Sequence, residues 1–342
     1  MNKTLTSSRF FIILYLVRKE RIFIMEIYDI IIIGGGPAGM TAALYACRQN
    51  RNTLLLEKDF FGGQASKSPH IENFPGFDGP GEELMTQFRA SLRKLTNFKV
   101  EFEEATHISQ SENNYWKIET TSESYLTKAV ILATGLHHKT INLPNEDELV
   151  KDGVLSYCTL CDGRFFEDGI TAVIGDSFTA SQYALDLSKY CRRVYIVALG
   201  DKLYCEQAMI DRINKTDNIE VCYNYNTTKI EYITGSNKQL VGLYNENSRQ
   251  YDVIVNGVFI AIGRESSITA DLFDIQDRVW LLDDKNLIKA YPHNATALRG
   301  LYAAGDCMNK TSPRQVITAA SDGATAAIEA DKYIESEFTD ED

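Results

Sequence analysis

Apolar and polar positions along this 342-residue chain predict the same strand–turn–helix–strand unit twice. The apolar strand DIIII (29–33) leads into a glycine-rich turn and an amphipathic helical run, and the strand TLLLE (53–57) follows. A shift of 141 residues lays this segment on AVIGDSFTASQYALDLSKYCRRVYIVA (172–198) without a gap. Each copy is later followed by an apolar strand with a small-residue turn, AVILATG (129–135) or GVFIAIG (257–263). The pattern therefore predicts two related α/β units.

Length and composition favour a soluble, acidic protein with two domains. The 342 residues exceed the roughly 250–300 at which a single hydrophobic core stops growing. Hydrophobic residues make up 44% of the chain, charged residues 24%, and the formal net charge is −12, which argues against disorder. Lysine and arginine form no basic stripe, and an acidic surface repels phosphate backbones, so we expect no nucleic-acid partner.

The first 24 residues precede Met25 and are interpreted separately. Their apolar run FFIILYLV (10–17) is shorter than the roughly 20 residues needed to cross a membrane, and no small-residue cleavage site follows it. We therefore expect no membrane partner, and we interpret residues 1–24 as an upstream extension or a mis-assigned start. This interpretation predicts a cytoplasmic protein whose seven cysteines are mostly reduced.

The turn after the first strand has the pattern of a dinucleotide-binding site. Gly34, Gly36 and Gly39 form G-x-G-x-x-G between strand and helix, and Glu57 follows 18 residues later. The first glycine allows the tight turn, the second lets backbone N–H groups approach a pyrophosphate, and the third lets the helix pack on the strand. The helix N-terminus adds partial positive charge, and an acid at this distance takes the ribose hydroxyls. We predict dinucleotide binding here in preference to a simple glycine-rich turn.

A second pattern, SYCTLCDGRFF (156–166), brings two cysteines together. At C-x-x-C spacing, Cys158 and Cys161 can both lie at the start of a helix, whose dipole and free N–H groups lower the pKa of a thiol. A structural zinc site is the competing interpretation, but it needs four ligands and the sequence has no second C-x-x-C. We predict a redox-active pair and no metal site. The remaining cysteines are interpreted as packing residues: Cys47, Cys191, Cys205, Cys222 and Cys307.

Six motifs occur in a fixed order from about Met25 onward: GGGPAGM (34–40), GGQ (62–64), ENFPG (72–76), ATG (133–135), CTLCDG (158–163), and AAGDC with RQVITAASDG (303–323). With these motifs the chain resembles the low-molecular-weight thioredoxin reductases. The resemblance implies an α/β fold of two Rossmann-like, three-layer dinucleotide-binding domains, the second inserted into the first. It also implies FAD as cofactor, a homodimer, an FAD domain of residues 25–140 and 264–342, and an inserted redox-disulfide domain of residues 141–263.

The resemblance further implies which residues act. In the family the cysteine matching Cys161 faces the flavin, the one matching Cys158 attacks the disulfide of the partner thioredoxin, and Asp162 matches the acid that protonates a leaving thiolate. Helix capping by the Asp162 carboxylate is compatible with that role. By motif match, the FAD contacts would be Gly34, Gly36, Pro37, Ala38, Gly39, Glu57, Gly63, Gln64, Asn73, Ala133, Thr134, Gly135, Gly305, Asp306, Arg314 and Gln315.

The second turn departs from this pattern. Gly36 is replaced by Ser177 and Gly39 by Ala180, and Asp176 occupies the place of the glycine between. A β-carbon obstructs a pyrophosphate and a carboxylate repels it, whereas Asp176, Ser177 and Thr179 are good caps for their own helix. Members that use NADPH carry His-Arg-Arg for its 2′-phosphate, where this chain has Ala-Leu-Gly (198–200). Two lost charged hydrogen bonds cost about 3–6 kcal/mol, so we expect NADPH to bind poorly.

Loss of the nicotinamide site leaves the electron donor to be identified. The departure resembles the ferredoxin-dependent flavin thioredoxin reductases, so we expect reduced ferredoxin to be the donor. Because ferredoxins are usually acidic, a local basic patch is required on this acidic chain, and Lys189, Arg192 and Arg193 are candidates. The alternatives are an NAD(P)H-dependent thioredoxin reductase with a diverged nicotinamide site, or a non-catalytic flavin-binding redox sensor.

Overall fold

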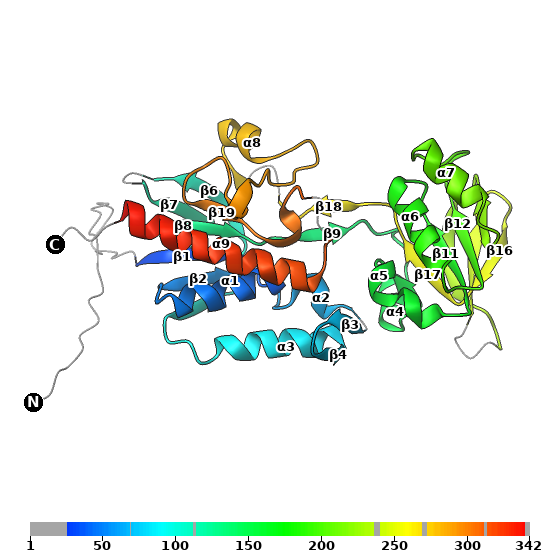
Figure 1. Ribbon diagram of the computed structural model, residues 1–342, viewed down its shortest axis with the longest axis horizontal. Coiled ribbons are helices and arrows are strands. Elements are labelled where there is room, and N and C mark those ends of the chain that lie inside the picture. The colour runs from blue at the N-terminus through cyan, green and yellow to red at the C-terminus, as the bar shows by residue number, and fades with distance from the viewer. Residues whose placement is uncertain are drawn as a thin grey trace, which may run out of the picture. The chain divides into compact units, whose positions relative to one another are not determined.

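The computed structural model describes residues 26–68, 70–111, 114–235, 240–268, 272–310 and 313–338. The interpretation of residues 1–24 therefore falls outside the described residues. The chain divides into two compact units (Figure 1). Unit 1 comprises the chain up to Ser66, Glu82–Leu136 and the chain from Ser266, and unit 2 comprises Lys67–Gly81 and His137–Glu265. The grouping of residues 67–81 with unit 2 differs from the expected domain boundaries, which stay a prediction.

Unit 1 is built around a seven-stranded sheet with the order β5-β2-β1-β8-β7-β6, and β19 pairs with β8. Strands β5, β2, β1, β8 and β19 run parallel, whereas β6 and β7 extend the sheet as an antiparallel hairpin. Its main elements are β1 (Ile27–Ile33), α1 (Pro37–Arg48), β2 (Thr53–Leu56), α2 (Gly63–Ser66), α3 (Gly81–Leu92), β5 (Phe98–Glu101), β6 (Ala105–Gln110), β7 (Trp116–Thr120), β8 (Ser124–Leu132), α8 (Ile275–Leu281), β19 (Leu301–Ala303) and α9 (Val316–Glu337).

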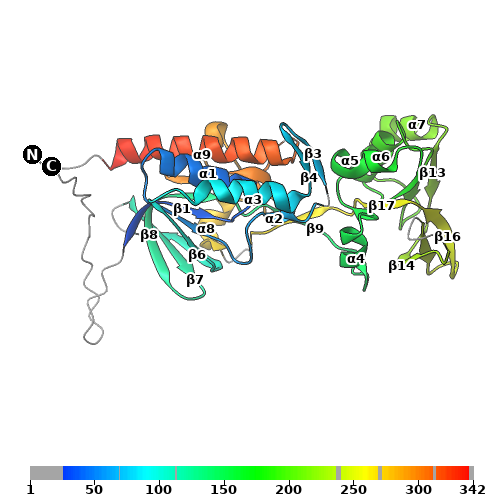
Figure 2. The ribbon, with the colours of Figure 1, turned by 90° about the horizontal axis from the view of Figure 1, so that it is seen from below.

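Small residues let two helices of unit 1 lie close together. Helices α1 and α9 run side by side in both views (Figures 1 and 2). A β-carbon at Gly323 of α9 would lie 2.1 Å from the Ala38 carbonyl oxygen of α1, so only glycine allows this approach. Under them, Ile30 to Ile32 of β1 are fully buried, as expected for a central parallel strand. The C-terminal helix is thereby fixed over the glycine-rich turn.

Unit 2 has a five-stranded parallel sheet, β10-β17-β11-β12-β13, and an antiparallel three-stranded sheet, β14-β15-β16. Its elements are β3 (Ile71–Phe74), β4 (Phe77–Gly79), α4 (Glu146–Lys151), β10 (Leu155–Ser156), α5 (Thr159–Asp162), η2 (Gly163–Phe166), β11 (Ile170–Ile174), α6 (Phe178–Leu187), β12 (Arg193–Val197), α7 (Gln207–Asn214), β13 (Ile219–Cys222), β14 (Thr227–Tyr232), β15 (Val241–Asn245), β16 (Gln250–Val255) and β17 (Gly257–Ile260).

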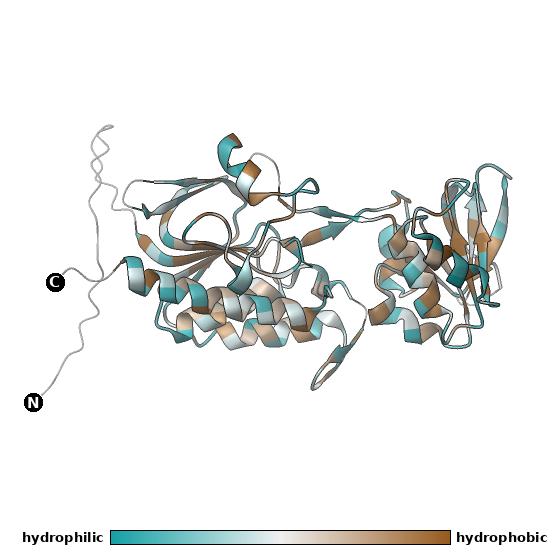
Figure 3. Ribbon diagram, turned by 45° about the horizontal axis from the view of Figure 1, so that its top comes forward, coloured by the Kyte–Doolittle hydropathy of each residue, from teal (hydrophilic) through white to brown (hydrophobic). Residues whose placement is uncertain are grey.

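Alternation along the central strand of unit 2 explains its three layers. Ala172 and Ile174 of β11 join a core with Ile230, Leu243 and other residues of the antiparallel sheet. Val173, between them, joins the core formed with helices α6 and α7. Figure 3 shows the hydrophobic colouring concentrated in the strands of each unit. The predicted fold class, two Rossmann-like three-layer α/β units, is confirmed.

The two chain crossings between the units, β9 (Leu136–His138) and β18 (Arg264–Ser266), pair as a two-stranded ribbon. Residues 137–265 of unit 2 thus interrupt unit 1 in sequence. Among the helices that the structure describes, none is long and apolar enough to span a bilayer.

Candidate active site

The glycine-rich turn of unit 1 leaves the start of helix α1 open. Gly36 is the N-cap, and no side chain forms a capping hydrogen bond there. A β-carbon added to Gly36 would meet no atom within 4 Å. At Gly39, by contrast, a β-carbon would lie 1.8 Å from the Gly34 carbonyl oxygen, and at Gly34, where φ is +108°, 2.4 Å from the Ala133 carbonyl oxygen. Gly34 and Gly39 are therefore required by close packing, and Gly36 keeps space free in front of the N–H groups of α1.

The parallel order of the sheet gathers the other predicted contacts at the same edge. Gly34 follows β1, Glu57 follows β2, the Ala133-Thr134-Gly135 turn follows β8, and Gly305 follows β19, on four strands that are neighbours. Pro37 and Ala38 are the first two residues of helix α1. Gly63 of α2 lies close to the turn, since a β-carbon added to it would be 3.4 Å from the Gly36 Cα. Ligands of open α/β sheets bind at this carboxyl edge.

Glu57 is held close to the turn. Its Oε2 accepts a hydrogen bond of 2.6 Å from the Gly35 N–H, and its Oε1 accepts one of 3.0 Å from the Asp59 N–H. Each carboxylate oxygen has a second lone pair, so both can still accept a ribose hydroxyl. The position agrees with the role that the spacing predicted for Glu57, which stays a prediction.

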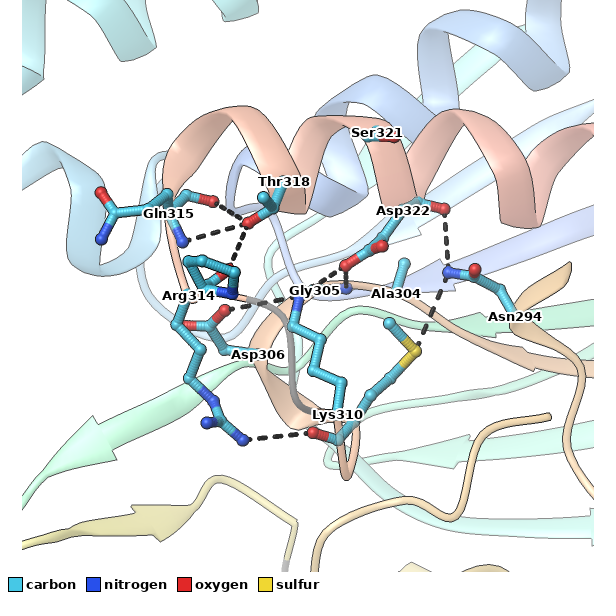
Figure 4. A network of polar contacts seen from close by, with 12 residues as sticks. Asn294, Ala304, Gly305, Asp306, Lys310, Arg314, Gln315, Thr318, Ser321 and Asp322 are labelled. Carbon is cyan, nitrogen blue, oxygen red and sulfur yellow. Dashed lines mark hydrogen bonds and ion pairs between the residues drawn. The ribbon is translucent and has the colours of Figure 1, made fainter. Parts of the chain in front are cut away.

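The C-terminal part of the cradle is a polar network around Gly305 (Figure 4). Asp322 of α9 accepts hydrogen bonds from the Gly305 N–H at 3.2 Å and from Lys310 Nζ at 2.6 Å. The same ammonium lies 3.9 Å from Asp306 Oδ1. Gln315 is the N-cap of α9, and its N–H donates to Thr318 Oγ1 at 3.1 Å. These contacts fix the turn that follows β19 against the start of α9.

Arg314 supplies a test of whether the cradle fits a cofactor. Its Nη2 donates to the Met308 carbonyl at 3.3 Å, whereas its Nε is buried and has no hydrogen-bond partner among the residues that the structure describes. A buried guanidinium N–H without an acceptor is costly. Together with the open space at Gly36, this donor fits a polar group bound at the edge of the sheet.

Gln64 and Asn73 complete the predicted set and lie on different elements. Gln64 is in the short helix α2 of unit 1. Asn73 is on β3, and the hairpin of β3 and β4 belongs to unit 2. The structure therefore brings together the contacts on β1, β2, β8, β19 and α9, while Asn73 is carried by the unit that holds the cysteines.

Cys158 and Cys161 form a disulfide, with their Cα atoms 5.3 Å apart. Cys158 is the N-cap of α5, and its sulfur accepts a hydrogen bond of 3.2 Å from the Cys161 N–H. Helix α5 is a single turn that continues as the 3₁₀ helix η2, so the predicted helix start is present but its dipole is that of a short helix. A thiolate at Cys158 is instead stabilised locally, by the N–H that already points at its sulfur.

Gly163 lets this turn lie against the end of the neighbouring helix. A β-carbon there would lie 2.1 Å from the Tyr190 hydroxyl. Beside the half-buried cysteines, Leu160 is 62% and Phe165 50% exposed, so the disulfide is flanked by apolar surface. Such a surface suits contact with a protein substrate.

Asp162 is buried next to the disulfide, and its environment was not visible in the motif. Burial raises the pKa of its carboxyl, opposed by a hydrogen bond from Ser156 and by the nearby His70. Ser156 Oγ donates to Asp162 Oδ2 at 2.5 Å, and the same oxygen accepts from the Cys158 N–H at 3.0 Å. Sequence reasoning missed Ser156, although a hydroxyl residue two positions before Cys158 at a strand end was a usable signal.

A second, partly buried cluster next to the cysteines was also missed. The Tyr157 hydroxyl donates to the buried Glu146, and its ring stacks on His138 with centroids 4.6 Å apart. The Tyr183 hydroxyl donates to the Tyr157 carbonyl at 2.9 Å. Burial lowers the pKa of His138 to about 3, aided by the nearby Arg264. His138 is therefore neutral near neutral pH.

The turn of unit 2 is filled by the chain itself. Ser177 is the N-cap of α6 and accepts from the Ala180 N–H at 3.5 Å, which confirms one of the three expected caps. The segment after β12 returns across the turn: Ser177 and Tyr204 form a β-bridge, and the Tyr204 N–H donates to the Asp176 carbonyl at 2.6 Å. The N–H groups and carbonyls that would face a nucleotide are thus partly occupied by protein atoms.

The predicted basic patch is largely neutralised. Lys189 Nζ lies 2.6 Å from Asp186 Oδ1, and Arg193 Nη2 lies 3.0 Å from Glu220 Oε2. Of the three candidate cations, these two have carboxylate partners on unit 2. This pairing weakens the prediction that Lys189 and Arg193 attract an acidic protein.

Comparison with known proteins agrees with this geometry. The chain matches the family model described as pyridine nucleotide-disulphide oxidoreductase over residues 28–323. It is 35% identical to a thioredoxin reductase of Listeria monocytogenes, covering 91% of this chain and 95% of the relative. It is 33% identical to one of Ureaplasma parvum, covering 90% and 97%. The crystal structure of thioredoxin reductase from Streptococcus pyogenes superposes with a TM-score of 0.82 at 32% identity, covering 91% and 99%.

The glycine cradle, the disulfide next to a buried acid and these matches lead to one assignment. Members of the family are FAD-binding flavoproteins that reduce the thioredoxin disulfide through a C-x-x-C pair. The chain belongs to the low-molecular-weight thioredoxin reductases of the pyridine nucleotide-disulphide oxidoreductase family.

Proposed function

We propose that this chain is a flavin-dependent reductase that passes electrons from reduced ferredoxin through FAD and the Cys158–Cys161 disulfide to thioredoxin. The observation that supports the donor is the filled turn of unit 2, where Ser177 and the Tyr204 segment occupy the place of a nicotinamide nucleotide. The proposal includes a homodimer, as the resemblance implies, which sedimentation of the purified protein tests, and a cytoplasmic location, as the interpretation of residues 1–24 predicts.

The unit 1 cradle would hold the cofactor through its backbone and a few side chains. The open N-terminus of α1 and Gly36 would receive the diphosphate, Glu57 a ribose, and Asp306 with Arg314 the remaining polar groups. When bound, FAD supplies the chemistry that turns single electrons into a pair. The residues themselves orient it and exclude water.

The disulfide carries the pair to the substrate by thiol exchange. In the reduced enzyme the Cys158 thiolate attacks one sulfur of the thioredoxin disulfide, forms a mixed disulfide, and releases the other sulfur as a thiolate, which Asp162 protonates. The Cys161 thiol then gives up its proton and attacks the Cys158 sulfur, and the second thioredoxin sulfur leaves as a thiolate and takes up that proton. Thioredoxin gains two electrons and two protons, and Cys158–Cys161 is again oxidised.

Energetics permit a ferredoxin donor. A ferredoxin near about −400 mV that reduces a thioredoxin near about −270 mV releases roughly 6 kcal/mol for two electrons. A ferredoxin must also dock on this chain, and Lys189 and Arg193 are already paired with carboxylates. Docking must therefore use cations elsewhere or a mainly apolar surface.

An NAD(P)H donor is the second candidate, and one observation favours it: the matching family model is described by its pyridine nucleotide. Against it, Leu199 and Gly200 stand where cations for a 2′-phosphate are expected, and Leu199 is 65% exposed with no charge to offer. The two candidates differ only in what reduces the flavin.

Anaerobic stopped-flow reduction of the flavin-loaded protein separates them. We expect slow bleaching with NADPH or NADH, fast bleaching with reduced ferredoxin, and thiol formation when oxidised thioredoxin follows. Fast bleaching by either nicotinamide nucleotide would replace the ferredoxin donor by the second candidate. Bleaching without any thioredoxin reduction would leave only a flavin-binding redox sensor.

A further inference from the structure

Ser156 has a position that the thiol chemistry does not explain by itself. It is 5% exposed at the end of β10, and its neighbour in the sheet is Phe259 of β17. Its Oγ lies 2.5 Å from Asp162 Oδ2, 3.0 Å from the Cys158 nitrogen and 3.4 Å from the Cys158 carbonyl oxygen. A hydroxyl has one proton to donate, and the carboxylate is the nearer acceptor. Ser156 thus connects the acid with the first cysteine.

The two oxygens of Asp162 are in different surroundings. Oδ2 accepts from Ser156, whereas Oδ1 is buried and has no hydrogen-bond partner within the described ranges. When the carboxyl is protonated, a donor at Oδ2 leaves Oδ1 as the oxygen that carries the proton. A buried carboxyl fixed in this way offers one defined proton next to the disulfide.

We propose that Ser156 is a positioning residue, which fixes the Asp162 carboxyl so that Oδ1 delivers the proton to the thiolate leaving thioredoxin. The inference rests on the proposed role of Asp162 as that acid. It adds a residue outside the C-x-x-C-D motif to the machinery, and it assigns Ser156 two tasks, to orient the acid and to accept the Cys158 N–H.

The hydrogen bond also has an electrostatic consequence. A donor stabilises the ionised carboxylate more than the neutral acid, so its loss raises the pKa of Asp162 further. The elements packed on α5 are β3, η2 and α6. Besides the two thiols of the opened disulfide, the titratable or charged groups on or near these elements are His70, Glu72, Asp78, Arg164, Glu167, Asp176, Tyr183, Asp186, Lys189 and Tyr190.

The test measures single-turnover reduction of thioredoxin by the chemically reduced, flavin-loaded protein from about pH 5 to about pH 9. The variants are Ser156→Ala, Ser156→Thr, Asp162→Asn and, as a matched control, Ser188→Ala, whose hydroxyl donates only to the Leu185 carbonyl at 2.9 Å on the same unit. His70→Gln removes the imidazole that acts on the Asp162 carboxyl. Bound flavin and thermal unfolding report folding.

For Ser156→Ala we expect the rate at its optimum to fall about tenfold and the high-pH limb to move up by about one pH unit. Ser156→Thr keeps the hydroxyl and should restore both, and Ser188→Ala should match the parent. An unshifted limb in Ser156→Ala, while Asp162→Asn loses the limb, would overturn the inference and keep the role of Asp162. A parent-like profile in Asp162→Asn would overturn the role of Asp162 instead. If Ser156→Ala unfolds, a rate profile of Ser156→Thr unlike the parent's counts against the inference.

Discussion

The two α/β units share one design and differ in what meets the start of their first helix. In unit 1 the N-cap is Gly36, with no side chain to occupy the helix N-terminus, and the buried Arg314 Nε has no hydrogen-bond partner among the described residues. In unit 2 the N-cap is Ser177, whose hydroxyl accepts from its own helix, and Tyr204 bonds to the adjoining backbone. Helix caps are worth about 1 kcal/mol, so unit 2 gains stability where unit 1 retains binding capacity.

The close contacts behind each turn show that the common fold did not force this difference. A β-carbon at Gly34 would lie 2.4 Å from the Ala133 carbonyl, and one at Gly175 2.6 Å from the Ala261 carbonyl. Both glycines serve the turn itself. The first glycine of the motif is therefore kept in both units, whereas the other two are replaced in unit 2 by Ser177 and Ala180.

The largest expected effect comes from the disulfide of unit 2. Cys158→Ser should lower thioredoxin reduction by at least about a thousandfold, because the attacking thiolate is lost, while flavin content stays unchanged. A coupled insulin-reduction assay with fixed flavin loading measures this. Cys205→Ser is the control, since this free cysteine lies 3.3 Å from Ser181 Oγ in the same unit. Full turnover of Cys158→Ser would remove the disulfide from the mechanism.

Gly36→Ser gives unit 1 the cap of unit 2. The backbone at Gly36, φ −75°, suits any residue, so the apoprotein should keep its thermal stability while FAD affinity falls about ten- to hundredfold as the side chain fills the diphosphate space. Gly39→Ala is the matched contrast, because its β-carbon collides with the Gly34 carbonyl and should destabilise the apoprotein as well. Titration of apoprotein with FAD and thermal melts give both values. Unchanged FAD affinity in Gly36→Ser would contradict the proposed cradle.

The reverse change restores cations to unit 2. Ser177→Gly combined with Ala198→His, Leu199→Arg and Gly200→Arg should raise NADPH affinity about tenfold, less than two full charged bonds would give, because the Tyr204 segment still crosses the turn. Equilibrium titration with NADPH measures the change. A variant with Ser177→Gly and glutamine at positions 198–200 controls for side-chain size. Equal NADPH affinity in the two variants would show that missing positive charge is not the reason for weak binding.

The smallest effect concerns acid stability of unit 2. Burial lowers the pKa of His138 to about 3 in the folded protein, whereas its pKa in the unfolded chain is about 6.5. Below about pH 6.5 the unfolded chain therefore binds a proton that the folded protein does not bind. Stability is therefore lost as the pH falls from about 6.5, by about 1 kcal/mol at about pH 6. Denaturant unfolding at several pH values should show this loss in the parent and its absence in His138→Phe. As a control at an exposed histidine, His293→Phe should show the same loss of stability as the parent.

Local patterns were enough to predict much of this molecule. Hydrophobic alternation gave the two α/β units, and glycine spacing gave the turn at Gly34 and its acid at Glu57. The order of parallel strands then makes the meeting of Gly34, Ala133 and Gly305 unavoidable, because their strands are neighbours. The serine that caps α6 was also predictable from its residue type, since capping is a contact within four residues.

Contacts between distant segments needed the tertiary structure. The return of the Tyr204 segment across Asp176, the pairing of Arg193 with Glu220 and the unpartnered Arg314 Nε depend on how loops cross the sheet edges, which no local propensity specifies. The hairpin that carries Asn73 joins unit 2 for the same reason. The sequence alone determined the chemistry at Cys158 and Cys161. Only the fold decided that Asp162 is buried against Ser156, because burial is a property of the whole packed unit.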